Sequence, residues 1–197
     1  MSMDEYVMVV EARPLMDKFG IYRGLDALGG EVADYILATH SFMPRRLAEA
    51  DPAYKQIIPY VTVRCEGLWL VFRRKAAQTE QRLHNKHSLG LGGHITREAD
   101  TAPNPILAGL HRELAEEITL EHGEPRYLGV LNDDTNDVGR VHLGLLYEVR
   151  AKSRSFAMPE ADKMDARWMD AGGVRACFDT METWSQFVIE QLVIDLA

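Results

Sequence analysis

The stretch 92–120 carries the most regular pattern of apolar and polar positions in the chain, and its second half has helical spacing. With about 100° of rotation per residue, the aliphatic residues of this half fall in one narrow stripe: Leu107, Leu110, Leu114 and Ile118. A second stripe, about 100° away around the helix, holds carboxylates: Glu113, Glu116 and Glu117. The pattern therefore predicts a helix with one buried side and one acidic side.

The rest of the chain alternates between strand-like and helix-like segments. Strands are predicted over 6–12, 56–64, 68–73, 87–95, 126–131, 140–149 and 166–169, with a hairpin turn at 65–67. Helices are predicted over 31–39, just after Pro44, and from 179 towards the C-terminus. This order indicates an α/β protein with a mixed β-sheet and helices on its sides.

Composition and charge narrow the class of partner. The 197 residues are 46% hydrophobic and 26% charged, as in an ordinary globular chain of one domain, or of one domain with an extension. The net charge is −8, from 22 basic and 30 acidic residues. Because binding to nucleic acid depends on clustered Lys and Arg, we expect no nucleic-acid partner. A small anionic ligand remains compatible with local positive charge and a metal ion.

Cysteine use and hydropathy indicate a cytoplasmic protein. Cys65 and Cys177 lack the spacing of metal ligands, so we expect ordinary reduced thiols. No stretch approaches the roughly 20 apolar residues of a membrane span. The acidic N-terminus lacks the basic and apolar regions of a signal peptide. We therefore expect no membrane partner.

The acidic stripe needs an explanation because its charges repel. Carboxylates three and four residues apart on a helix destabilise it by a few tenths of a kcal/mol per pair. Arg112, four residues before Glu116, offsets only part of this charge. Such a stripe suits a hard cation that takes oxygen ligands, such as Mg²⁺. The alternative is a solvated acidic face, which is the commoner explanation for an arbitrary pair of glutamates on a helix.

A known motif favours the metal. The segment 112–117 reads Arg-Glu-Leu-Ala-Glu-Glu, and Gly92, Gly93 and His94 precede it. These residues resemble the Nudix box of the Nudix hydrolases, G-x5-E-x7-R-E-U-x-E-E-x-G-U, in which U is a bulky aliphatic residue. Leu120 fits the last position of the box.

Two positions of the box depart from the pattern, and its first loop is longer. The glutamate before the arginine is replaced by Asn104, which can cap a helix but supplies no carboxylate. The glycine after the glutamate pair is Thr119, which enters the left-handed region less easily. Strict spacing places the opening glycine at Glu98, so relative to Gly93 the loop is about five residues longer.

The resemblance implies a Nudix-like α/β/α sandwich and a reaction. Nudix hydrolases cleave a nucleoside diphosphate linked to another group, usually with Mg²⁺ or Mn²⁺. Carried over by position, Gly93 offers a carbonyl ligand and Glu113, Glu116 and Glu117 offer carboxylates, one of which accepts the proton of the attacking water. Arg112 orients them. The implied partner is a small-molecule diphosphate substrate.

Two other functions stay open. Isopentenyl diphosphate isomerases share the box, but their proton shuttle is a cysteine just before the glycine turn, where this chain has Ser88 and Leu89. That difference disfavours an isomerase. A non-catalytic, Nudix-like ligand sensor is the other alternative. Such domains typically lose the glutamates of the box, and here all three are present.

The resemblance covers residues 56–197, which we predict to be the Nudix hydrolase domain. Residues 1–55 have too little apolar periodicity for a core of their own. We predict an N-terminal extension that packs on the catalytic domain or on a second subunit of a homodimer.

Basic and histidine residues near the glycine turn are further candidates. Arg73 and Arg74 end a predicted strand and would stabilise a bound diphosphate; the alternative is an exposed loop end. A zinc site was also considered for His84, His87 and His94, but no convincing ligand partners accompany them in the sequence. We interpret these histidines as hydrogen-bonded structural groups.

Overall fold

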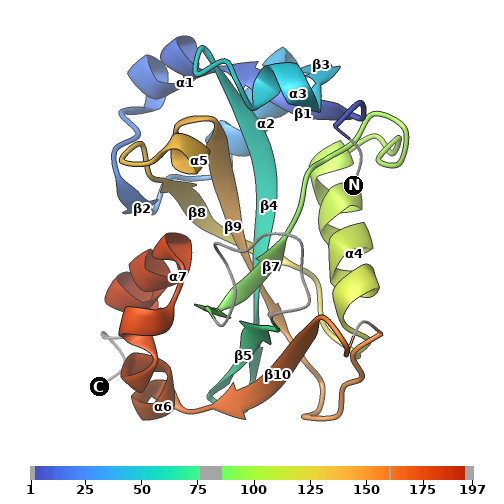
Figure 1. The fold of residues 1–197 in the computed structure, drawn as a ribbon, viewed down its shortest axis with the longest axis vertical. Coiled ribbons are helices and arrows are strands. Elements are labelled where there is room, and N and C mark those ends of the chain that lie inside the picture. The colour runs from blue at the N-terminus through green and yellow to red at the C-terminus, as the bar shows by residue number, and fades with distance from the viewer. Residues whose placement is uncertain (1–2, 76–85, 160, 194–197) are drawn as a thin grey trace. The chain divides into compact units, whose positions relative to one another are not determined.

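The computed structural model describes residues 3–75, 86–159 and 161–193, which form a mixed β-sheet with helices in the α/β/α arrangement predicted from the sequence (Figure 1). Contacts divide the chain into two compact units. Unit 1 comprises Met1–Tyr60, Gly92–Arg112 and Tyr127–Tyr147; unit 2 comprises Val61–Leu91, Glu113–Arg126 and Glu148–Ala197. Five elements continue from one unit into the other: β4 (Tyr54–Cys65), β7 (Gly90–Gly92), α4 (Pro105–Glu117), β8 (Arg126–Asn132) and β9 (His142–Arg150).

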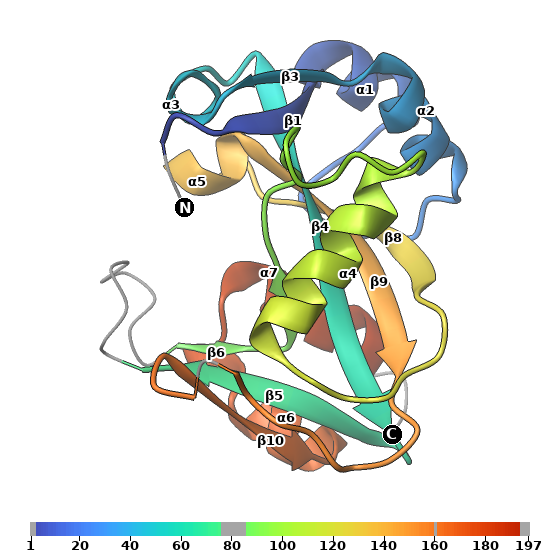
Figure 2. The same ribbon diagram turned by 90° about the vertical axis from the view of Figure 1, so that its right-hand side faces the viewer.

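Unit 1 contains the strand order β4-β9-β8-β2, with β1 on β4 and β3 on β1. Its other strands are β1 (Tyr6–Glu11), β2 (Gly24–Asp26) and β3 (Ser41–Pro44). Its helices are α1 (Ala12–Phe19), α2 (Glu31–Thr39), α3 (Arg45–Ala48) and α5 (Asp137–Arg140). Strand β1 runs antiparallel to both β3 and the start of β4 (Figure 2). All residues from Val7 to Val10 are buried, so both faces of β1 are covered.

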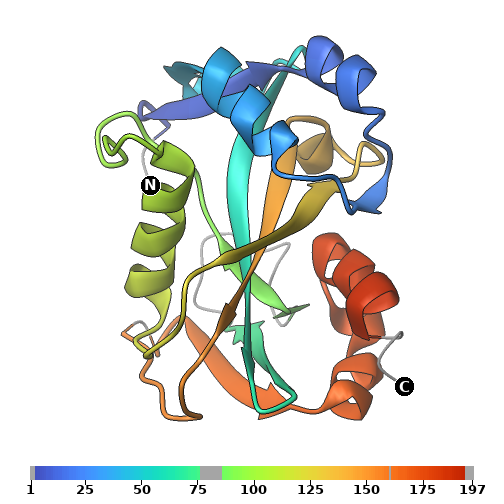
Figure 3. The same ribbon diagram turned by 180° about the vertical axis from the view of Figure 1, so that it is seen from behind.

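Unit 2 is built on a hairpin and a C-terminal helical segment. Strand β5 (Leu68–Arg74) pairs with the end of β4, with β10 (Met164–Met169) and with the short β6 (His87–Ser88). The hairpin turn is confirmed: Glu66 and Gly67 have φ values of 51° and 83°, and such positive values match the right-handed twist of the flanking strands. The C-terminal helices follow (Figure 3): α6 (Ala171–Ala176), η2 (Phe178–Thr180), α7 (Thr183–Val188) and η3 (Ile189–Val193).

Two predicted strands differ in extent from the observed ones, because side-chain oxygens accept hydrogen bonds from the backbone amides there. The strand predicted over 87–95 is broken at Leu89, whose amide donates to Ser185 Oγ (2.8 Å) instead of to a neighbouring strand. The strand predicted over 140–149 starts only at His142. Before it, Asn136 Oδ1 accepts from the amide of Gly139 (2.9 Å), which caps the helical turn α5. No helix among the described residues is long and apolar enough to cross a membrane.

We propose that residues 1–55 are an extension that the catalytic domain needs for stability. In unit 1, β1 pairs with β4 through Glu11↔Tyr54, Val10↔Lys55 and Val9↔Gln56. Val7, Val9 and Leu15 are 0% exposed. Full burial of each such side chain contributes about 1.5–3 kcal/mol, and whole proteins are stable by only about 5–15 kcal/mol.

A protein that begins at Lys55 is therefore expected to unfold at a much lower temperature or to aggregate. Thermal unfolding and size-exclusion chromatography of the shortened and full chains would measure this. A shortened protein with the solubility, stability and oligomeric state of the full chain would refute the proposal.

Candidate functional site

Helix α4 begins directly after Asn104, the residue that stands where the box pattern has a glutamate and that we expect to cap a helix. The side-chain oxygen of Asn104 accepts from the amide of Leu107 (3.1 Å), as an N-cap residue does, and Pro105 occupies the first helical position. Asparagine in place of the family glutamate therefore starts the helix.

Helix α4 ends without a residue in the left-handed region of backbone conformation. Thr119 is therefore tolerated where the box pattern has glycine. Among the described non-glycine residues only Glu66 has a positive φ. Thr119 instead exchanges two backbone hydrogen bonds with Ala157, both of 2.9 Å. Because the chain leaves α4 in an extended conformation, a glycine is not required there.

The apolar stripe is buried, but the acidic stripe is not uniformly solvated. Leu110, Leu114 and Ile118 are 1–2% exposed, which confirms the predicted inner side there, whereas Leu107 is only half-buried. On the other stripe, Glu116 is exposed and Glu117 is half-buried. Glu113 is only 2% exposed. The structure thus takes one of the three predicted carboxylates out of solvent.

Arg112 is held by a carboxylate that the sequence reasoning missed. Its guanidinium donates through Nε and Nη2 to the two oxygens of Asp100 (3.0 and 3.1 Å), and Nη2 also donates to the carbonyl of His94 (2.8 Å). Asp100 is 3% exposed, and its Oδ2 accepts from the amide of Thr96 (2.7 Å). This two-point ion pair ties the loop after the glycine turn to α4. The longer loop therefore contains its own brace.

Two glycines allow close packing around this loop. A Cβ at Gly92 would lie 2.7 Å from the carbonyl oxygen of Pro59, so only glycine fits beside β4. A Cβ at Gly109 would lie 3.1 Å from Ile95 Cγ1 and 3.5 Å from Asp100 Oδ2. Gly93, the predicted carbonyl ligand, follows β7 directly and lies in unit 1, whereas Glu113, Glu116 and Glu117 lie in unit 2.

The predicted phosphate-binding arginines end strand β5. Arg73 is exposed, and it is paired in register with His87 of β6 and Asp165 of β10. Burial, followed by the charges of Arg167 and Arg73, lowers the pKa of His87. Two cations thus act on His87 at this end of β5, and the carboxylate of Asp165 opposes them. A contact of Arg73 or Arg74 with substrate stays a prediction.

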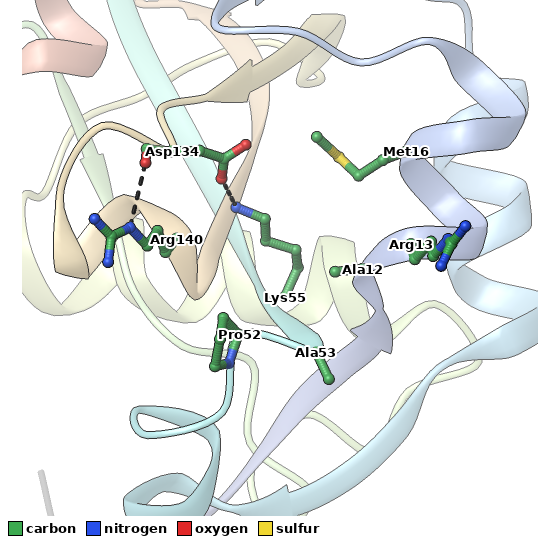
Figure 4. A pocket seen from close by; sticks show the side chains of 8 residues that line it. All are labelled: Ala12, Arg13, Met16, Pro52, Ala53, Lys55, Asp134 and Arg140. Atoms are coloured by element: carbon green, nitrogen blue, oxygen red, sulfur yellow. Dashed lines mark hydrogen bonds and ion pairs between the residues drawn. The ribbon is translucent and has the colours of Figure 1, made fainter.

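A pocket in unit 1 has at its centre a lysine that hydrogen-bonds within the protein (Figure 4). Its central cation, Lys55, is 2% exposed and donates to Asn132 Oδ1 (3.0 Å), to Asp134 and to the carbonyl of Gly139 (2.8 Å). These bonds use all three ammonium donors. Burial lowers the pKa of Lys55, and Asp134 opposes that shift. Lys55 is therefore a structural cross-link. The pocket is lined by Ala12, Arg13, Met16, Pro52, Ala53, Lys55, Asp134 and Arg140.

Comparison with known proteins identifies the family. No family model matches the chain. Protein YmaB of Bacillus subtilis (strain 168) is 34% identical over 203 residues, which cover 97% of this chain and 98% of that protein. The crystal structure of Tm1382, described as a candidate Nudix hydrolase, is 31% identical, covers 98% of this chain and 100% of its own, and superposes with a TM-score of 0.84.

More distant structures share the fold. The NUDIX domain of Shewanella oneidensis NrtR, solved with ADP ribose, is 15% identical, covers 73% of this chain and 89% of its own, and has a TM-score of 0.57. The likeness to Tm1382 over the whole chain and the Nudix box on α4 agree. The chain belongs to the Nudix hydrolase family.

Proposed function

We propose that this chain is a metal-dependent hydrolase of a diphosphate linkage in a nucleoside diphosphate derivative, acting by attack of water on phosphorus. The observation that carries the proposal is the stripe of three carboxylates on α4, Glu113, Glu116 and Glu117, in a chain that is 31% identical to Tm1382 over 98% of its length. Like charges this close on one helix repel, and a divalent cation that binds them offsets the repulsion.

The donor set fits a hard divalent cation. Glu113, Glu116 and Glu117 offer only carboxylate oxygens, and the family pattern adds the carbonyl oxygen of Gly93. Such ligands favour Mg²⁺ or Mn²⁺. When bound, the cation would neutralise diphosphate charge and lower the pKa of a coordinated water.

The chain's own groups would then position the reaction. Glu113, Glu116 and Glu117 hold the cation, and one of these three carboxylates accepts the proton of the attacking water. Arg112 orients the start of this acidic segment. Its own position is fixed by the two-point bond to Asp100, which supports its role as a positioning residue.

ADP ribose is the first substrate to test, because the NrtR domain that shares the fold binds it. The decisive experiment incubates the full chain and Mg²⁺ with ADP ribose, nucleotide sugars, dinucleotides, CoA derivatives and nucleoside triphosphates. The expected products of a diphosphate derivative are two phosphorylated fragments. Binding of ADP ribose without turnover of any compound would contradict the proposal and favour a ligand sensor.

Positive charge at the end of β5 is proposed to bind the substrate. Changing Arg73 and Arg74 together to alanine is expected to raise KM for a diphosphate substrate about tenfold, equivalent to about 1.4 kcal/mol, with little change in Mg²⁺ affinity. Steady-state kinetics and Mg²⁺ titrations would separate the two effects. Lys152→Ala, an exposed cation paired with Glu121, is the matched control. An unchanged KM would identify both arginines as solvated residues of the strand end.

We also propose that the enzyme works in the cytoplasm. Cys65 and Cys177 are both free thiols in the structure, and free thiols persist in reducing compartments. Fractionation of cells that express the full chain would test the location.

A further inference from the structure

Three metal-ligating side chains meet in unit 1, and none of them is a carboxylate of α4. Glu49 follows α3, His94 follows the glycine turn, and His142 begins β9. The Nε2 atoms of the two histidines are 3.2 Å apart, and His142 Nε2 is 4.0 Å from Glu49 Oε1. One ligand atom from each residue lies within 4.8 Å of the others.

This spacing is close to that of a zinc site. Zinc bonds to nitrogen and oxygen of about 2.0–2.2 Å in a tetrahedral arrangement place ligand atoms roughly 3.3 Å apart. The histidine pair already has this separation. Glu49 is half-buried; its carboxylate must come about 0.7 Å nearer to His142 Nε2 and at most about 1.5 Å nearer to the ligand atom of His94, which a glutamate side chain can do by rotation.

The hydrogen bonds of His142 prepare it as a ligand. Its Nδ1 lies 2.7 Å from the carbonyl oxygen of Val138, and a carbonyl only accepts, so Nδ1 carries the proton. The neutral ring then presents the lone pair of Nε2 to the cluster, where it accepts a hydrogen bond from His94 Nε2 (3.2 Å), so His94 carries its proton on Nδ1 instead when a cation binds. A backbone carbonyl on the far nitrogen is the arrangement that orients metal-bound histidines. The backbone of His94 is held in place as well, because its carbonyl oxygen accepts from Arg112 Nη2 (2.8 Å).

The neighbouring charges can accommodate a cation. Arg45 donates to Glu49 Oε1 (3.3 Å) but also to Glu5 Oε1 (2.9 Å), so Glu5 can retain the guanidinium when Glu49 turns to a metal.

We propose that Glu49, His94 and His142 form a second divalent-cation site, one that takes Zn²⁺. Imidazole nitrogens suit zinc, whereas Mg²⁺ prefers oxygen ligands, so the two sites of the chain differ in the metal they select. Three protein ligands leave a fourth position for water. Because His94 is bonded to Gly93, the cation fixes the segment that carries the carbonyl ligand proposed for the Nudix box.

The site differs from the zinc site considered from the sequence. Of the three histidines weighed there, His84 lies outside the described residues. His87 lies in unit 2, where its Nδ1 is 2.8 Å from Thr180 Oγ1. Only His94 takes part, and its partners come from distant parts of the chain.

Cobalt is the probe that tests the proposal, because Co²⁺ in a tetrahedral nitrogen and oxygen site absorbs visible light much more strongly than in an octahedral oxygen site. The titration uses full-length Glu117→Gln protein, in which the box carboxylates are impaired. We expect one strongly absorbing Co²⁺ per chain, displaced by Zn²⁺ but not by Mg²⁺. Glu49→Gln in the same background should weaken the affinity at least about tenfold, and His142→Ala should abolish the band.

Glu11→Gln, an exposed glutamate of β1, is the matched control and should leave the Co²⁺ titration unchanged. If His142→Ala does not fold, Glu49→Gln decides, because Arg45 keeps its bond to Glu5 in that variant. Absence of a strong band, or equal affinity with and without the Glu49 carboxylate, would overturn the proposal. Hydrolysis is not measured, so this outcome is independent of the proposed function.

Discussion

Glu117→Gln is expected to lower Mg²⁺-dependent hydrolysis by orders of magnitude. Loss of a partner one shell away from a metal already costs about 10–100-fold, and Glu117 is proposed to touch the metal itself. The amide both weakens the cation site and misplaces the attacking water. Turnover of the best substrate from the compound panel, measured at saturating Mg²⁺, gives the ratio of kcat values.

The fold of this variant should remain intact. Removing one of three neighbouring carboxylates relieves repulsion, so the metal-free protein should be as stable as the wild type, or more stable by a few tenths of a kcal/mol. Glu124→Gln makes the same change at an exposed glutamate beyond the helix and should keep full activity. Full activity of Glu117→Gln, as of the control Glu124→Gln, would show that α4 does not belong to the catalytic centre.

Asp100→Ala is expected to destabilise the protein by about 3–5 kcal/mol, the usual effect of removing one partner from a buried ion pair. The side chain of Asp100 is 1% exposed and that of Arg112 is 24% exposed, so the guanidinium left behind is largely shielded from water. Urea unfolding of the two proteins would measure the difference. Asp137→Ala, which removes an aspartate side chain that is 93% exposed, should change stability by no more than about 0.5 kcal/mol.

The variant Asp100→Asn tests whether the ion pair between Asp100 and Arg112 acts on catalysis as well as on stability. The amide keeps the shape of the side chain but loses the charge that holds Arg112. If Arg112 positions the acidic segment, kcat should fall by about 10–100-fold while KM changes little. A normal kcat in a folded Asp100→Asn protein would restrict the ion pair to a structural role.

Elements encoded by local patterns were predictable from the sequence. The helix over 31–39 is confirmed as α2 with the same ends, and the stripe from Leu110 to Ile118 is the buried side of α4. The hairpin at 65–67 was also predicted, because a glycine between two β-branched or aromatic segments is a local signal.

Features that depend on tertiary contacts were not predictable. Helical periodicity places Glu113 on the acidic stripe, but it does not say what packs against that stripe, and the structure buries this residue. Asp100 reaches Arg112 only because the loop folds back over 12 residues. His142 meets His94 across 48 residues. No spacing rule within a single sequence identifies such pairs.

The stabilisation of the full chain by Mg²⁺ tests the central claim, that α4 carries the metal site, most directly. Ligand at about 100 times Kd stabilises a folded protein by about 2.7 kcal/mol, which for a chain of this size raises Tm by roughly 5–10 °C. The wild type and Glu124→Gln should show this increase, and Glu117→Gln should lose most of it. An equal increase in Tm for Glu117→Gln and the wild type would contradict the account.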